Sequence, residues 1–203
     1  MKIICSKIAA LSASVVVVVV MMLQASFASA ASAQDSSLAA AEWVARQEIA
    51  LLQRRYAQAT DMIAFDREAN EAKVAAIYGQ IFTEDAPMGV LDRMTLDSPT
   101  EWLKMVVARF EPMIGAQHLI GSQVVELESL PDQQGRGGAA TMRSYLQATH
   151  VNADGTLERV LGIYISDAIY IPDHGWRLSR MTLQLVSTED AKIAAPLALE
   201  EPE

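Results

Sequence analysis

The sequence is poor in cysteine, in basic residues and in histidine, and each shortage excludes a class of protein. A single cysteine excludes an internal disulfide and a zinc ribbon built from cysteine pairs. Lys and Arg number 16 against 25 Asp and Glu, and this net charge of -9 argues against nucleic-acid binding through phosphate contacts. The three histidines show no His-x-x-x-His spacing, so we expect no metal site.

The apolar content is, by contrast, sufficient for a folded core. Hydrophobic residues make up 51% of the 203 positions, which is too many for a disordered chain and suits one domain. No internal repeat is present.

The first thirty residues have the three parts of a secretory signal peptide. Lys2 and Lys7 precede an apolar run over 8–23, which is followed by Ala-Ser-Ala at 28–30. We expect cleavage after Ala30, with Ala33 as a second possible site, and a secreted or periplasmic product that has no cysteine and no membrane attachment. The alternative is an uncleaved membrane anchor, for which the apolar run is short.

The remaining chain changes from helical to strand-like texture near Pro112. A long helix is expected from Leu38, because apolar residues recur at spacings of three and four, and a second over 71–82. Ser98 and Pro99 are typical of the start of a third. Four strands with turn-like connections are expected over 117–129, 139–151, 159–171 and 175–187.

This order predicts an α+β fold in which helices cover one face of an antiparallel sheet. The expected segments are a signal peptide over 1–30, a flexible tether over 31–41, one domain over 42–187 and a disordered acidic tail over 188–203.

Two histidines are predicted to point inward. Strand alternation places His150 on the face of Met142, Leu146 and Ala148, and His118 on the face of Ile120. An imidazole in an apolar hollow can titrate near neutral pH and transfer protons, or it can be a hydrogen-bonded core residue. His174 falls in a turn and is expected in solvent.

Asp61 lies off the apolar stripe of its helix, so it can orient a histidine or simply pair with Arg54 or Arg55. Tyr56, Trp102 and Tyr164 stand at apolar positions and are expected in the core or the wall of a pocket.

Four stretches in order resemble the SnoaL-like branch of the nuclear-transport-factor-2-like superfamily, and within it scytalone-dehydratase-like members. They are Tyr-Ala-Gln-Ala-Thr-Asp at 56–61, Phe-Thr-Glu-Asp-Ala at 82–86, Gln-His-Leu-Ile-Gly at 117–121, and the pair Gly-Ile-Tyr at 162–164 with Gly-Trp-Arg-Leu at 175–178.

The resemblance implies a cone-shaped curved sheet with a pocket in its mouth, and dehydratase or isomerase chemistry without a cofactor. It implies that His118, Asp61 and His150 are catalytic. It places Ser166, beside the aromatic residues, among the substrate contacts. The chain departs from the family pattern at Thr60, which stands where the scytalone-dehydratase-like members have a tyrosine.

Three functions follow as hypotheses. The first is an exported dehydratase or isomerase of a small cyclic or polyketide-like compound. The second is a non-catalytic protein that binds a small apolar or aromatic molecule in the same pocket. The third is a structural protein that forms a homodimer through its open sheet face, as many members of the superfamily do.

Overall fold

The computed structural model describes residues 35–192, so the predicted signal peptide and the end of the tail lie outside it. The chain divides into two compact units, which meet between Trp43 and Val44. In the first unit, residues 35–43 are helical. The stretch expected as a tether is therefore helical from residue 35 onward. Within 35–192, no helix is both long and apolar enough to cross a bilayer.

Three helical segments precede the long strands of the second unit. Residues 44–65 are helical, and α2 (Arg67–Ile81) and α3 (Pro99–Arg109) follow. Asp66 caps α2 by accepting a hydrogen bond from the Ala69 N–H at 3.0 Å, so this helix starts four residues before the predicted position. Ser98 caps α3 by accepting from the Glu101 N–H, and Pro99 occupies the first turn, as predicted.

The apolar stripe predicted for the first helix is buried throughout. Its members are Ala45, Ile49, Leu52, Tyr56, Ala59 and Ile63.

The four predicted strands form an antiparallel meander and are longer than expected. They are β3 (Met113–Ser129), β4 (Ala139–Asn152), β5 (Thr156–Ile171) and β6 (Gly175–Lys192). β6 extends to Lys192, so residues 188–192, which were expected in the tail, belong to a strand.

Two short strands escape prediction and make the sheet mixed. Between α2 and α3, β1 (Met88–Val90) and β2 (Met94–Leu96) form a hairpin, and β1 runs parallel to β6. The sheet order is β2-β1-β6-β5-β4-β3. Strands of three residues, one of which follows Pro87 and contains Gly89, are too short to show an alternating pattern. The sequence of this segment therefore indicates only a break between helices.

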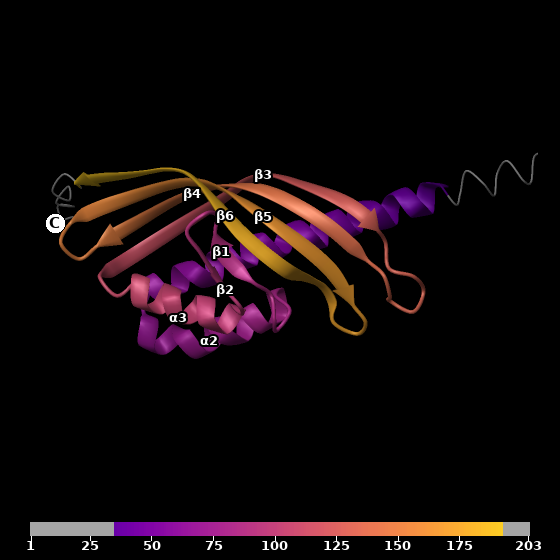
Figure 1. The fold of residues 1–203 in the computed structure, drawn as a ribbon, viewed down its shortest axis with the longest axis horizontal. Coiled ribbons are helices and arrows are strands. Elements are labelled where there is room, and N and C mark those ends of the chain that lie inside the picture. Colours follow the sequence, from indigo (N-terminus) through magenta and orange to yellow (C-terminus); the bar gives the residue numbers. More distant parts are fainter. Residues whose placement is uncertain (1–34, 193–203) are drawn as a thin grey trace, which may run out of the picture. The chain divides into compact units, whose positions relative to one another are not determined.

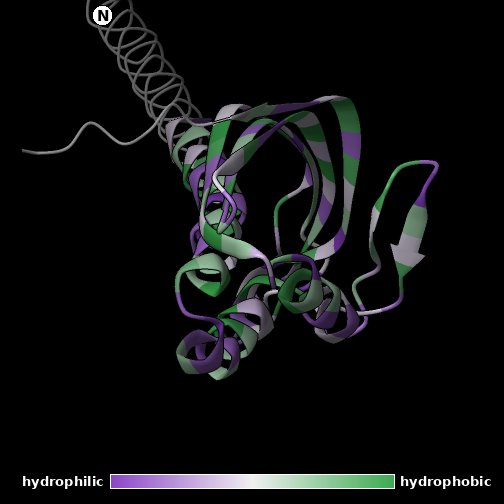
Figure 2. Cartoon of the chain, turned by 90° about the vertical axis from the view of Figure 1, so that its left-hand side faces the viewer, coloured by the Kyte–Doolittle hydropathy of each residue, from purple (hydrophilic) through white to green (hydrophobic). Residues whose placement is uncertain are grey.

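The sheet curves over the helices and remains open (Figure 1). Hydrophobic and hydrophilic residues alternate along its strands (Figure 2). In β4, every second residue from Ala140 to His150 is buried, and this set defines the concave face. A register shift in β3 between Gly121 and Val124 accompanies a positive φ of 44° at Ser122, as expected where a bulge bends a strand.

Candidate functional site

A cavity of about 340 Å³ lies between the concave face of the sheet, α3 and the β1–β2 hairpin. Its wall is mainly apolar, with Val90, Met94, Met105, Val106, Phe110, Leu146, Ala148, Val160, Leu183 and Leu185. Its polar side chains are Tyr56, Thr60, Arg93, Trp102, Arg109, His118, His150, Glu158, Tyr164 and Thr188. A hollow with a mainly apolar surface on which polar side chains converge is the usual form of a small-molecule site.

His118 on β3 and Asp61 on the first helix form an imidazole–carboxylate pair. The His118 Nδ1 lies 2.6 Å from the Asp61 Oδ1, and the Asp61 Oδ2 accepts the His118 backbone N–H at 3.1 Å. Because a carboxylate only accepts, the Nδ1 carries the proton and the Nε2 of a neutral ring is left as an acceptor. The pairing that the resemblance implied is thus present in the geometry.

The alternative partners of Asp61 are engaged elsewhere. Arg54 donates to Gln123 at 3.1 Å, and Arg55 donates to Gln80 at 2.7 Å.

His150 on β4 has its own carboxylate. Its Nδ1 lies 2.8 Å from the Oε2 of Glu158, and one Arg109 nitrogen contacts the two Glu158 oxygens at 2.8 and 2.7 Å. The His150 Nε2 is buried without a hydrogen-bond partner in the described chain. Burial lowers the pKa of His150, the Glu158 hydrogen bond opposes this, and the charges of His118 and Arg109 lower it further.

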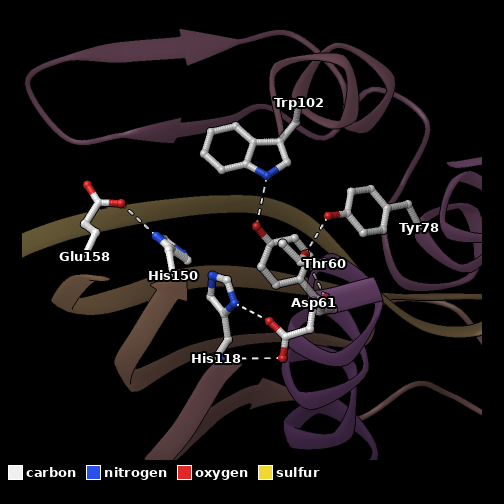
Figure 3. A network of polar contacts seen from close by, with 8 residues as sticks. Thr60, Asp61, Tyr78, Trp102, His118, His150 and Glu158 are labelled. Carbon is white, nitrogen blue, oxygen red and sulfur yellow. Dashed lines mark hydrogen bonds and ion pairs between the residues drawn. The ribbon is translucent and has the colours of Figure 1, made fainter. Parts of the chain in front are cut away.

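The two imidazoles face one another in the same cavity (Figure 3). Their ring centroids are 5.3 Å apart, and Phe110 lies 5.2 Å from the His150 ring and 6.3 Å from the His118 ring. The sheet and the first helix therefore bring two carboxylate-bound imidazoles to one apolar hollow.

Aromatic residues close the cavity beside His118. The Trp102 Nε1 donates to the Tyr56 hydroxyl at 2.9 Å, and Tyr164 packs edge-on against Tyr56 at 5.9 Å between centroids. The Tyr78 hydroxyl lies 2.7 Å from the Thr60 Oγ1, which in turn contacts the Tyr56 carbonyl at 2.9 Å. Burial raises the pKa of Tyr56, Tyr78 and Tyr164, so these phenols keep their protons at neutral pH.

Ser166 does not line this cavity, although it was expected among the substrate contacts. It is fully buried on the concave face of β5, and its hydroxyl donates to the Gln53 Oε1 at 3.3 Å. The first helix covers this part of the sheet, so the serine serves the core. Tyr56, Trp102 and Tyr164 do line the cavity.

Glu158 and Arg109 are the site residues that sequence reasoning missed. Glu158 stands directly opposite His150 in the β4–β5 ladder. The predicted strand began at 159, three residues after the observed start at Thr156, and so left Glu158 outside the strand. Pairing the two strands symmetrically about the Asn-Ala-Asp-Gly turn at 152–155 would have set His150 opposite Leu157, so the partnership with Glu158 follows only from the observed register, which is centred on residue 154.

No group of three His, Cys, Asp or Glu side chains among residues 35–192 is arranged as a metal site. The absence of a metal site and of a cofactor stays a prediction.

Known structures share this fold. A candidate scytalone dehydratase from Novosphingobium aromaticivorans is 18% identical, with a TM-score of 0.60, over 80% of this chain and 98% of that one. A candidate aromatic-ring hydroxylase from the same organism is 21% identical, with a TM-score of 0.55, over 73% of this chain and 92% of that one. A type 2 hexachlorocyclohexane dehydrochlorinase is 14% identical, with a TM-score of 0.56, over 75% and 97%.

These identities establish likeness of fold alone. A search of curated protein sequences gave no match. The family model of the SnoaL-like domain matches residues 41–182, which is more than two thirds of the chain. The chain therefore belongs to the SnoaL-like domain family.

Proposed function

We propose that the protein is a cofactor-independent dehydratase or isomerase that acts on a small cyclic or polyketide-like compound by acid–base chemistry. The observation that carries the proposal is the His118–Asp61 pair, with 2.6 Å between Nδ1 and Oδ1, in an apolar cavity that also holds His150.

In this role the His118 Nε2 is an acid–base group of the site, and a proton leaves the carbon next to the substrate carbonyl. The C–H electron pair forms the new double bond, and a hydroxide on the next carbon leaves as water with a proton from the site. Asp61 keeps the Nδ1 protonated and stabilises the imidazolium that forms. An isomerase would instead return the proton to another carbon of the same substrate.

The substrate class follows from the size and lining of the cavity. About 340 Å³ suits a molecule of one or two rings, and Phe110, Trp102 and Leu146 offer apolar contact. The structural relatives include proteins named for dehydration and for dehydrochlorination, both of which are eliminations.

The test is a panel of cyclic β-hydroxyketones incubated with the full chain. Formation of the conjugated enone is followed by ultraviolet absorbance and confirmed by NMR. We expect turnover by the wild type and by His174→Ala, whose histidine is exposed in a turn, and loss of turnover in His118→Ala. Equal turnover by His118→Ala would contradict the proposal.

A second candidate function is binding of an apolar ligand without chemistry. Thr60 favours it, because a threonine tied to the Tyr78 hydroxyl stands where scytalone-dehydratase-like members have a tyrosine. A panel compound that binds and is recovered unchanged, with no conversion of any other compound, would support this function and contradict catalysis.

We also propose that the protein is exported after cleavage behind Ala30, since residues 1–30 read as a signal peptide. Mass spectrometry of protein secreted or released from the periplasm should give a mature chain that starts at Ala31. Recovery of the uncut chain in the membrane fraction would favour the anchor instead.

Finally, we propose a homodimer in which the convex sheet face meets its copy. Exposed apolar residues on four neighbouring strands support it, among them Leu119, Tyr145, Leu161 and Val186.

A further inference from the structure

The His150 Nε2 is a buried polar atom without a partner in the described chain. Buried nitrogens are almost always hydrogen-bonded, because leaving one unpaired costs free energy. The other ring nitrogen faces Glu158, which accepts, so a neutral His150 presents its Nε2 as an acceptor. The His150 side chain lines the same cavity as His118. His150 can therefore accept a hydrogen bond or a proton from a molecule bound in this site.

Glu158 is itself held in place from a second element. Arg109, at the end of α3, contacts its two oxygens at 2.8 and 2.7 Å, while the ladder of β4 and β5 sets Glu158 opposite His150. A carboxylate that contacts both a cation and an imidazole has little freedom to turn away. This arrangement matches the way in which second partners fix the tautomer and the orientation of working histidines.

We propose that Glu158, held by Arg109, is a positioning residue that makes His150 a second proton carrier, so that the two imidazoles handle different protons of one substrate. The inference rests on the proposed dehydratase or isomerase function and deepens it. It differs from a single-imidazole reaction, in which His118 alone would take a proton and return it.

The charged groups around the two imidazole rings indicate which ring acts as the acid and which as the base. The groups that face His150 are Glu158 on β5, His118 on β3 and Arg109 on α3, while Asp61 stands behind His118. Rings whose centroids are 5.3 Å apart do not readily carry two protons at once. The pKa of His150 is lowered by burial and by the charges of His118 and Arg109, which suits His150 to the role of base. The role of acid then falls to His118, whose ring contacts the Asp61 carboxylate.

The division of roles gives a balanced elimination. His150 Nε2 forms a bond to the proton of the carbon next to the carbonyl, and the C–H pair becomes the double bond. The β-hydroxide leaves as the C–O bond breaks, and it takes the Nε2 proton of the protonated His118 to form water. One proton enters the pair of rings and one leaves it, so the site resets by passing a proton from His150 to His118.

The two imidazoles limit the substrate class more narrowly than the fold does. The two rings are inclined at 50° to one another, so they address different atoms of the ligand. A cyclic β-hydroxyketone whose acidic hydrogen and hydroxyl lie on neighbouring carbons meets this requirement.

The test is NMR of the full chain labelled with ¹⁵N in its three histidines, across a pH titration. His174, exposed in its turn, serves as an internal reference. We expect His150 as the Nδ1–H tautomer at neutral pH, with a pKa below the ordinary histidine value of about 6.5. In Glu158→Gln, which removes the charge that favours the imidazolium, the His150 pKa should fall below its wild-type value while His174 stays unchanged.

The matched control is Asp167→Asn on the opposite face of β5, where Asp167 pairs with Arg180 at 2.6 Å. It should leave the His150 titration as in the wild type. With a compound that the wild type converts, Glu158→Gln should lower kcat by on the order of tenfold to a hundredfold, with little change in KM and a shifted pH profile.

The outcomes separate the two proposals. An Nε2–H tautomer at His150, or a His150 titration that Glu158→Gln leaves unaltered, would overturn the inference. Full turnover by Glu158→Gln in a protein that depends on His118 would overturn it too and leave the proposed function standing. No conversion by the wild type, with the His150 response intact, would count against the function instead.

Discussion

At the residue scale, Asp61 contacts both the ring and the backbone of His118. One oxygen receives the His118 ring N–H at 2.6 Å, and the other receives the backbone N–H of the same residue at 3.1 Å. The contact to the backbone fixes the distance between the first helix and β3, and the contact to the ring fixes the tautomer. Orientation and charge are therefore supplied together.

We predict that Asp61→Asn lowers kcat by on the order of a hundredfold or more, because the amide lacks the charge that stabilises the His118 imidazolium. Steady-state kinetics on a compound from the hydroxyketone panel would measure it. Asp85→Asn, an exposed carboxylate of the segment between α2 and β1, is the control and should match the wild type. A wild-type kcat in Asp61→Asn would show that the pair is only structural.

His150 also makes stability depend on pH in a predictable direction. Its pKa in the folded protein is lowered, mainly by burial, so the unfolded chain binds a proton there more readily than the folded one. This contribution leaves stability unaffected above the ordinary histidine value of about 6.5 and subtracts from it as the pH falls through that value.

Urea unfolding at a series of pH values, for the wild type and for His150→Gln, checks this prediction. The wild type should lose more free energy of unfolding than His150→Gln between neutral pH and the acid side of about 6.5. Other groups titrate in both proteins, so the difference between the two curves belongs to His150. Parallel curves would contradict the lowered pKa.

At the element scale, the sequence predicted the helices and strands that are long enough to show a regular pattern of apolar residues. The long apolar stripe of the first helix, the Ser98–Pro99 start of α3 and the four long strands were all confirmed. The hairpin of β1 and β2 was missed, because three residues cannot display a period of two.

The errors at the site have the same origin. Glu158 was missed because the start of its strand was predicted three residues late, although the residue lies opposite His150 in the ladder. Ser166 lies on the concave face of β5 but beneath the first helix, and only the packing of that helix decides whether such a position meets the cavity or the core. Strand register and helix placement are tertiary facts that a single sequence expresses weakly.

The β1–β2 hairpin depends on a close backbone approach at Gly89. A Cβ at this position would lie 2.3 Å from the Met94 carbonyl oxygen, a contact that the backbone can relieve only by moving the strands apart. We predict that Gly89→Ala lowers the free energy of unfolding by about 1–3 kcal/mol. It should also weaken the binding of compounds from the hydroxyketone panel, since Val90, Arg93 and Met94 of the hairpin line the cavity.

Chemical denaturation measures the first effect. Gly121→Ala on β3 is the matched control, because a Cβ there would meet nothing within 4 Å. It should leave stability close to the wild-type value. Equal stability of the two variants would contradict the prediction, because it would mean that the hairpin accommodates a Cβ at Gly89 with no loss in the free energy of unfolding.

At the scale of the whole molecule, the second unit uses the two faces of one sheet differently. The concave face contributes the core and both imidazoles, and helices cover it (Figure 1). On the convex face, Leu119, Tyr145 and Leu161 are 51%, 57% and 43% exposed, and they border a shallow groove lined also by Val186. Clustered exposed apolar side chains on a soluble protein usually mark an interface. The cavity lies on the opposite, concave side of the sheet.

We predict that the protein is a dimer in solution and that Tyr145→Glu makes it a monomer. A stable interface commonly buries about 800 Å² on each partner, and a charge forced into its apolar centre would remain unpaired when the copies meet. Light scattering across a range of protein concentrations measures the mass. Leu51→Glu, which alters a similarly exposed apolar residue of the first helix, is the control and should remain dimeric. A wild type that stays monomeric at the highest concentration would rule out this interface, and a dimer that survives Tyr145→Glu would place the contact elsewhere.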